Sequence, residues 1–422
     1  MRTSIVRRHW CVLAVAALTS AIAWVAAGAA PASASTASAG TDAAFRTAFS
    51  DVKTPVTQID LTADIQMSCG SGVFERLGSA PADNLVINGH GHTITGAGCH
   101  SQVLLNEGSG KLTLNDVTVT GGDYSDTCSI GGAGLQSNGD VDLIDAQIVG
   151  NTSTTTATDS ACGAMGGGIA MNADRTLSLV RSTVANNHAV CTSTCGIAIG
   201  GGIDIHNGIV DLQNSTVSDN TTSGPNTVAG GIEARAVTTV YSTIARNSAR
   251  TGANIGLENS ETEGEPVSLT AFATVIALPA GGGDNCAVNG TPTFTSHGYN
   301  FDDDGFCGFG SGPGDQSDAG DPGLGTLANN GGPTETLLPQ DGSKLIDAVP
   351  TASCSSDGAS TINPLTDQRS YPRPFGSGCD IGAVEVQPPP TSTTTTAAGG
   401  STTTTSAGGA AAPVEETPAF TG

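Results

Sequence analysis

The chain has 422 residues, including 58 Gly, 11 Cys and two Trp, and its 15 basic and 39 acidic residues give a net charge of −24 at pH 7. Such an acidic chain excludes a nucleic-acid partner and an anionic membrane surface, because both require a basic face. The many Gly residues and the scarcity of Leu-rich helical patterns favour an all-β protein.

The N-terminal segment, residues 1–34, has the features of a secretory signal peptide. Three Arg residues precede an apolar run at 10–27, and small residues at 32–34 provide an A-x-A cleavage site. A membrane-anchoring helix is the alternative, but the run lacks a basic stop-transfer flank. Cleavage would leave 12 basic and 39 acidic residues, a net charge of −27, and no transmembrane helix in the mature chain.

Ten Cys residues remain after Cys11 leaves with the signal peptide. An even number in an exported chain indicates disulfides, whereas zinc is disfavoured because no pair of C-x-x-C elements is present. The sequence leaves the connectivity open, and pairing between neighbours along the chain is the simplest arrangement. That arrangement joins Cys69 to Cys99, Cys128 to Cys162, Cys191 to Cys195, Cys286 to Cys307 and Cys354 to Cys379.

Residues 35–55 are predicted to form an N-terminal cap. The stretch "DAAFRTAFSDV" places five apolar residues on one helical face, namely Ala44, Phe45, Ala48, Phe49 and Val52. A short helix here would shield the open end of a repeat stack, because terminal repeats must cover the core.

The middle of the chain repeats a unit of a Gly pair, a short alternating strand, a polar turn and further strands ending in Asn. Examples are "GGGIAMNADRTLSLVRSTVANNHA" and "GGGIDIHNGIVDLQNSTVSDNTTS". The apolar anchors Leu135, Ile169, Ile203 and Ile232 are spaced 34, 34 and 29 residues apart. Because one coil cannot bury its own inward face, this period predicts a solenoid of stacked coils. We expect about ten coils, from about Val56 to about Ala348.

Each unit ends in an Asn, at Asn151, Asn187, Asn220 and Asn247. Asn suits a turn between strands because it tolerates left-handed dihedral angles and bonds its own backbone. Stacked Asn residues would also form a ladder of side-chain hydrogen bonds along the axis.

These repeats resemble those of right-handed parallel β-helix proteins, and the "GGI" and x-x-Asn elements are similar to repeats of polymorphic outer-membrane proteins. The C-terminal part is similar to choice-of-anchor Q surface proteins through "GYNFDDDGFCGF", "GDPGLGTLANNGGPTETLLPQDGSKLIDA" and "TDQRSYPRPFGSGCDIGAVE". The resemblance implies an all-β, right-handed parallel β-helix in an extracellular protein, and it implies no reaction. The predicted domains are the repeats at 56–285 and further coils with a C-terminal cap at 286–386.

Within this cap, Asp367, Arg369 and Arg373 are predicted to form an ion-pair network beneath the Cys354–Cys379 pair and to close the last coil. An Arg-rich site for an acidic ligand is the alternative interpretation.

Parallel β-helices also carry polysaccharide lyases and hydrolases, which need paired carboxylates or a base with calcium or Arg. The catalytic candidates are Asp204, His206 and Asp211, of which the first two are expected to share a strand face. Polar residues on a solvated strand are the alternative, because the sequence is expected to place Met171 and Ala234 at the same position in the neighbouring coils. The mature chain would have no Trp and only four Tyr, which disfavours carbohydrate-binding functions.

Calcium is the one cofactor that the sequence suggests. Asn300, Asp302 and Asp304 alternate before Gly305, as at the start of a calcium loop. The twelfth position is Ser311 and not the bidentate Glu of such a loop, so an Asp-rich turn tied by a disulfide is the alternative.

Residues 387–422 are rich in Thr, Ser and Pro and almost lack large apolar residues, which predicts a disordered stalk. The end "PAFTG" resembles a sortase signal, with matches at Ala419, Thr421 and Gly422. The apolar helix and basic tail that usually follow such a signal are absent, so either the sequence is truncated or the signal is vestigial.

The sequence therefore predicts a secreted protein attached to the cell wall that serves adhesion, with sortase and a surface polysaccharide or protein as partners. An extracellular polysaccharide lyase or hydrolase is the first alternative, and a structural component of the cell surface is the second.

Overall fold

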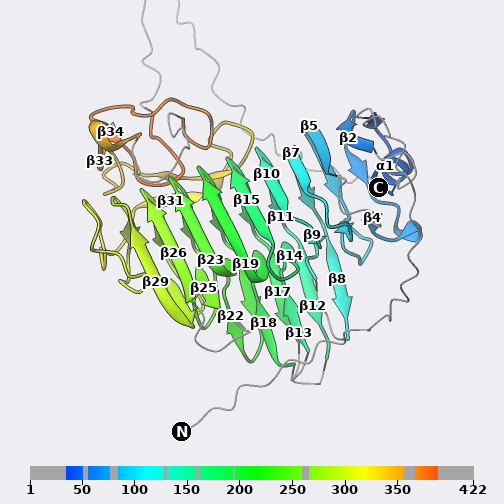
Figure 1. Ribbon diagram of the computed structural model, residues 1–422, viewed down its shortest axis with the longest axis horizontal. Coiled ribbons are helices and arrows are strands. Elements are labelled where there is room, and N and C mark those ends of the chain that lie inside the picture. The colour runs from blue at the N-terminus through cyan, green and yellow to red at the C-terminus, as the bar shows by residue number, and fades with distance from the viewer. Residues whose placement is uncertain are drawn as a thin grey trace, which may run out of the picture. The chain divides into compact units, whose positions relative to one another are not determined.

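The computed structural model describes residues 35–50, 56–76, 84–127, 131–157, 162–192, 195–258, 266–355 and 366–387. Within these ranges the chain is mostly β-structure and forms a parallel β-solenoid of about eight turns, with one short α-helix near the N-terminus (Figure 1). The predicted signal peptide, stalk and sortase signal lie outside the described residues.

Each full turn contributes strands to three faces of the solenoid, and neighbouring turns pair in parallel. The first face contains β1 (Ser35–Ala39), β2 (Val56–Leu61), β5 (Leu85–Thr95), β7 (Leu112–Thr120), β10 (Val141–Ile144), β15 (Thr176–Val180), β19 (Ile203–Gln213), β23 (Ile232–Val240), β26 (Pro266–Phe272) and β29 (Thr291–Ser296).

The second face contains β3 (Ile65–Gln66), the C-terminal halves of β5 and β7, β11 (Gln147–Val149), β16 (Thr183–Ala185), β20 (Thr216–Ser218), β24 (Thr243–Ala245), β27 (Val275–Ala277) and β30 (Phe301–Asp302). The third face contains β4 (Phe74–Arg76), β6 (Leu104–Asn106), β9 (Leu135–Ser137), β14 (Ile169–Met171), the N-terminal halves of β19 and β23, β25 (Ile255–Glu258) and β28 (Cys286–Asn289).

The core consists of aliphatic rows that run along the axis, one from each face. The anchors Leu135, Ile169, Ile203 and Ile232 are paired in register on the third face, as their spacing predicts, and all are fully buried. Alternation along each strand places these side chains inward and the polar residues outward. Burial of each Leu or Ile contributes about 1.5–3 kcal/mol, and no single coil could bury its row alone.

The open first coil is covered by α1 (Asp42–Ser50), which confirms the predicted helix. Thr41 precedes it, and its hydroxyl accepts a hydrogen bond from the amide of Ala44. Phe45 and Phe49 are buried, and the Phe45 ring packs edge-on against Phe74 of β4 at 4.8 Å between centroids. Val52 lies outside the described residues.

The predicted Asn ladder is present and consists of Asn151, Asn187, Asn220, Asn247, Asn254 and Asn285. In each step the Nδ2 of one Asn donates to the Oδ1 of the next, at 2.6–3.0 Å. Ladder residues are not themselves left-handed, contrary to the prediction. For the first four ladder residues the positive φ belongs to the preceding residue, as in Asn186 at 54° and Asp219 at 56°.

The ladder also explains why a Gly precedes each apolar anchor. A Cβ added to Gly202 or to Gly231 would lie 2.9 Å from the side-chain amide carbon of Asn220 or Asn247. Any larger residue would therefore push the ladder Asn out of register.

Between the second and third faces, several turns extend outward in two small parallel sheets, which we call the fin. One sheet contains β8 (Asp123–Asp126), β12 (Thr152–Thr155), β17 (His188–Cys191) and β21 (Thr221–Ser223), and the other contains β13 (Gly163–Met165), β18 (Ile197–Ile199) and β22 (Thr227–Val228). Ala and Cys side chains fill the space between the two sheets. The repeat pattern did not predict the fin.

The coils continue as far as β30, but residues from 320 onward leave the stack, in contrast to the predicted coils up to Ala348. The last parallel strand is β30, and residues 320–355 and 366–385, here the fold-back segment, return along the second face (Figure 1). This segment contains two antiparallel pairs, β31 (Leu324–Ala328) with β32 (Thr336–Pro339) and β33 (Val349–Pro350) with β34 (Gly378–Cys379).

A row of Thr hydroxyls on the second face binds the fold-back segment. Gln368 is fully buried, its Nε2 donates to Thr183 Oγ1 at 2.8 Å, and its Oε1 accepts from Thr216 Oγ1 at 2.6 Å. One strand further along, the Thr243 hydroxyl accepts from the amide of Ala383 at 3.0 Å. The segment therefore lies alongside the coils and buries their outer Thr row.

We expect Gln368→Ala to destabilise the fold-back segment by about 2–4 kcal/mol, because it leaves several buried polar groups without a partner. Amide hydrogen exchange within 366–385 should accelerate, while exchange in the coils stays slow. The matched control is Gln340→Ala at an exposed position of the same segment. Equal protection in both variants would show that Gln368 does not hold the segment.

Candidate functional site

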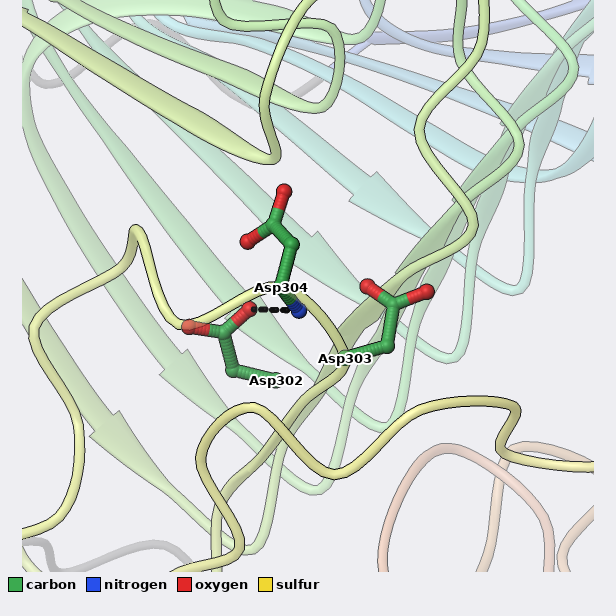
Figure 2. A group of neighbouring side chains, drawn as sticks. All are labelled: Asp302, Asp303 and Asp304. Carbon is green, nitrogen blue, oxygen red and sulfur yellow. Dashed lines mark hydrogen bonds between the residues drawn. The ribbon is translucent and has the colours of Figure 1, made fainter.

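Three consecutive carboxylates, Asp302, Asp303 and Asp304, form an acidic cluster at the C-terminal end of the solenoid (Figure 2). Asp302 ends β30, and one oxygen atom from each side chain lies within 4.8 Å of the others. Asp302 is fully buried, and burial raises its pKa to about 6. Burial likewise raises the pKa of Asp303.

The cluster terminates the Asn ladder. The Nδ2 of Asn285 donates to Asp302 at 2.8 Å and to Asp303 at 2.6 Å, and its backbone amide donates to Asp304 at 2.7 Å. In every step of the ladder the Nδ2 group of one Asn donates to the next Asn. The last Asn therefore needs an acceptor group that has no donor of its own to satisfy. An ionised carboxylate meets that need.

The predicted calcium ligands are only partly brought together. Asn300 directs its amide nitrogen to Asp315, Ser296 and the carbonyl of Ala271, while its Oδ1 accepts from the amide of Thr274. Asp303, which the loop pattern did not include, completes the cluster instead. Calcium at Asp302 and Asp304 stays a prediction. The hydrogen bonds that already occupy the carboxylates account for the cluster as a structural terminus.

The catalytic candidates lie on two different faces. Asp204 belongs to the third-face half of β19, whereas Asp211 belongs to its first-face half, beyond a register shift. Asp204 is only 6% exposed, so the prediction of a solvated strand was wrong at this position. The turn that leads from β18 into β19 packs against it, because a Cβ on Gly200 would lie 2.7 Å from the Cβ of Asp204. His206 is half-buried, and burial raises the pKa of Asp211.

The expected neighbours of Asp204 were also wrong. It pairs with Ala170 on one side and with Glu233 on the other, whereas Met171 and Ala234 pair with Ile205. Glu233 is 2% exposed, so two acidic side chains from adjacent coils are buried side by side. Alignment of "GGID" with "GGIE" would have found this pair, because both residues follow the anchor Ile.

The described disulfides join Cys69 to Cys99, Cys191 to Cys195, Cys286 to Cys307 and Cys354 to Cys379. These are the pairs between chain neighbours. Cys162 is also disulfide-bonded, and Cys128, its predicted partner, lies outside the described residues. One bond lies in the fin and another ties the acidic cluster to β28.

The predicted ion-pair network in the fold-back segment has a different membership. Arg369 pairs with Asp367 at 2.8 Å, whereas Arg373 pairs with Glu385 at 2.9 Å, and all four side chains are buried. The guanidinium of Arg373 also lies over the ring of Tyr241, whose hydroxyl donates to the carbonyl of Cys354. The network therefore fastens the segment to the side of the solenoid and does not close its last coil.

A polar cavity of about 260 Å³ opens where the fold-back segment meets β11. The second face contributes Gln147 and Val149, and the loop between β31 and β32 contributes Asn329, Pro333, Thr334 and Glu335. The loop is fixed in place, since the amide of Glu335 donates to Gln147 Oε1 at 3.1 Å and its carbonyl accepts from Thr183. Sequence patterns could not reveal this cavity, because its two sides are nearly 190 residues apart.

Among the described residues, no helix is long and apolar enough to span a membrane. No curated protein and no solved structure shows significant similarity to the chain. Residues 36–156, which run from β1 through the first coils into the fin, match the family model described as "Putative pectate lyase-like adhesive domain".

Proposed function

We propose that this protein is an extracellular adhesion module that binds polysaccharide or protein through the sides of its solenoid. The match of residues 36–156 to a pectate lyase-like adhesive domain carries the proposal. Support comes from the disulfides, which persist in oxidising compartments, and from a stiff stack that presents long lateral surfaces.

The proposed role is non-catalytic. Asp204 and Glu233 are 6% and 2% exposed, so a polysaccharide chain could not reach them, and Asp211 lies on another face. A glycosidase needs two carboxylates that both face the same scissile bond. This arrangement favours binding over the alternative of a lyase or hydrolase.

We further propose that the fold-back segment is the choice-of-anchor Q part of the chain and that the protein is displayed on the cell wall. Glu385, where the described segment nears its end, is held at its amide by Asp367, at its carbonyl by Arg369 and at its carboxylate by Arg373. Such a fixed exit point suits a domain carried on a stalk.

The test is retention of beads that carry the full chain on extracellular polysaccharides and on whole cells, with release of soluble sugar measured in parallel. We expect saturable retention without product. Beads that carry the reduced, unfolded chain are the control. Retention equal to this control would contradict adhesion, and time-dependent release of oligosaccharides would establish the enzyme instead.

A further inference from the structure

We infer that the cavity between β11 and the loop 329–335 is a binding site for one or two sugar units of a neutral polysaccharide. This inference deepens the proposed adhesive function and rests on it. A volume of about 260 Å³ is just below the range of about 300–1,000 Å³ that drug-sized ligands fill, so the cavity suits a small part of a longer chain.

The lining offers both donors and acceptors, which hydroxyl-rich ligands require. Asn329 is exposed, its Oδ1 accepts from the amide of Gly331, and its Nδ2 donates to no other group in the described part of the chain. Glu335 is half-buried, and its carboxylate has neither a hydrogen bond nor an ion pair to any described residue. An amide donor and a carboxylate acceptor across one small cavity can bind hydroxyl groups of a single sugar ring.

Charge decides against an anionic sugar. Two Arg residues contact the lining loop, and the guanidinium groups of both are already paired. Arg181, whose carbonyl accepts from Thr334, binds Asp145 at 2.6 and 2.7 Å. Arg369, which donates to the carbonyl of Asn330, is paired with Asp367. The carboxylate of Glu335 and the strongly acidic chain would repel a uronate.

An exposed aromatic ring stands beside the cavity. Tyr371 is 40% exposed, and a Cβ placed on Gly331 would lie 3.2 Å from its hydroxyl. The guanidinium of Arg369 lies 4.6 Å from the centre of the ring, and two amide groups bonded to Asp367 hold this turn. The ring is therefore held rigidly, and its apolar surface can continue the site beyond the cavity at little cost in conformational entropy.

The open part of the second face provides a path for the rest of the polysaccharide. No described residue upstream of Gln147 forms a hydrogen bond or an ion pair with the fold-back segment. The next outward residues in the same row are Thr118 and Thr93, paired in register. Both are partly exposed. A chain that enters the cavity can thus follow hydroxyl-bearing side chains towards the N-terminal coils.

The test is titration calorimetry of the full chain with cellotetraose, xylotetraose and galactotetraose, with tetragalacturonate as the anionic comparison. We expect at least one neutral oligosaccharide to bind and tetragalacturonate not to bind. Asn329→Asp keeps the contact with Gly331 but removes the donor, and Glu335→Gln removes the charge. Each should weaken binding about tenfold, the equivalent of one lost hydrogen bond to the ligand. Tyr371→Ala should weaken it about fivefold.

Asn289→Asp and Glu258→Gln on the third face are matched controls and should bind as the unaltered chain does. Unchanged melting temperatures would show that all variants are folded. Absence of binding by every neutral oligosaccharide, tighter binding of tetragalacturonate, or equal binding by cavity and control variants would each overturn the inference. Beads that carry the cavity variants separate the two proposals. Normal adhesion by the cavity variants would reject the cavity as the binding site but keep the adhesive function. Absence of adhesion by the unaltered protein would reject the adhesive function itself.

Discussion

Replacement of Asn220 by Ala is expected to lower the free energy of unfolding by about 3–6 kcal/mol, because several buried groups lose their partners at once. The Oδ1 of Asn220 accepts both the backbone amide and the Nδ2 of Asn187, each at 3.0 Å. Its Nδ2 donates to the carbonyl of Val184 and to Asn247, each at 2.9 Å. Ala leaves all of these groups in a dry environment, where water cannot replace the lost bonds.

Asn220→Asp should lower the free energy of unfolding at least as much at neutral pH. Its carboxylate oxygen would replace the Nδ2 donor and face two acceptors, the carbonyl of Val184 and the Oδ1 of Asn247. Denaturant titration followed by circular dichroism measures both variants. Asn172→Asp, at an exposed position, is the control and should change stability by less than about 0.5 kcal/mol. If Asn220→Ala unfolds at the same denaturant concentration as this control, the ladder contributes shape and not stability.

Arg373→Met is expected to cost about 3–5 kcal/mol at pH 8, the usual penalty for leaving one member of a buried ion pair. Glu385 loses its guanidinium partner, while the amides of Phe375 and Asp380 still donate to its carboxylate. The contact of Arg373 with the ring of Tyr241 is lost as well. Limited proteolysis and hydrogen exchange should show release of the fold-back segment while the coils remain folded.

The penalty should depend on pH in a defined direction. Burial raises the pKa of Glu385 to about 7 even beside Arg373, above the value of about 4.3 for an unfolded Glu. Between about pH 4.3 and about pH 7, Glu385 is protonated more often in the folded chain than in the unfolded chain. Its contribution to stability therefore falls as pH rises through this range. Without Arg373 the pKa moves higher still, and the fall continues above pH 7.

The difference between Arg373→Met and the unaltered chain should therefore widen from pH 6 to pH 9. Arg373→Met combined with Glu385→Gln removes the charge and should be nearly insensitive to pH in this window. Arg250→Met, at an exposed position, is the control for loss of an Arg. A pH-independent penalty in the single variant would contradict a role for the charge of Glu385.

The sequence predicted the candidate site only in part. Asp302 and Asp304 were found because polar residues alternate along this short stretch before Gly305. Residues so close in sequence also lie close together in the folded chain. Asp303 was missed because its role depends on Asn285 of another coil, to which it binds. Glu233 was missed because the prediction placed Ala234, one residue further on, beside Asp204. A shift of one residue moves a side chain to the opposite face of a strand.

Repetition determined the fold from the sequence alone. Anchors spaced by about one coil, alternating strands, Gly pairs and terminal Asn residues each specify the same stacked arrangement, because every coil meets a nearly identical neighbour. Tertiary structure alone decided where the non-repeating residues lie. The C-terminal segment folds back over the Thr row, and the cavity joins Gln147 to Glu335. These contacts link residues far apart in the chain, and no period in the sequence relates one side of such a contact to the other.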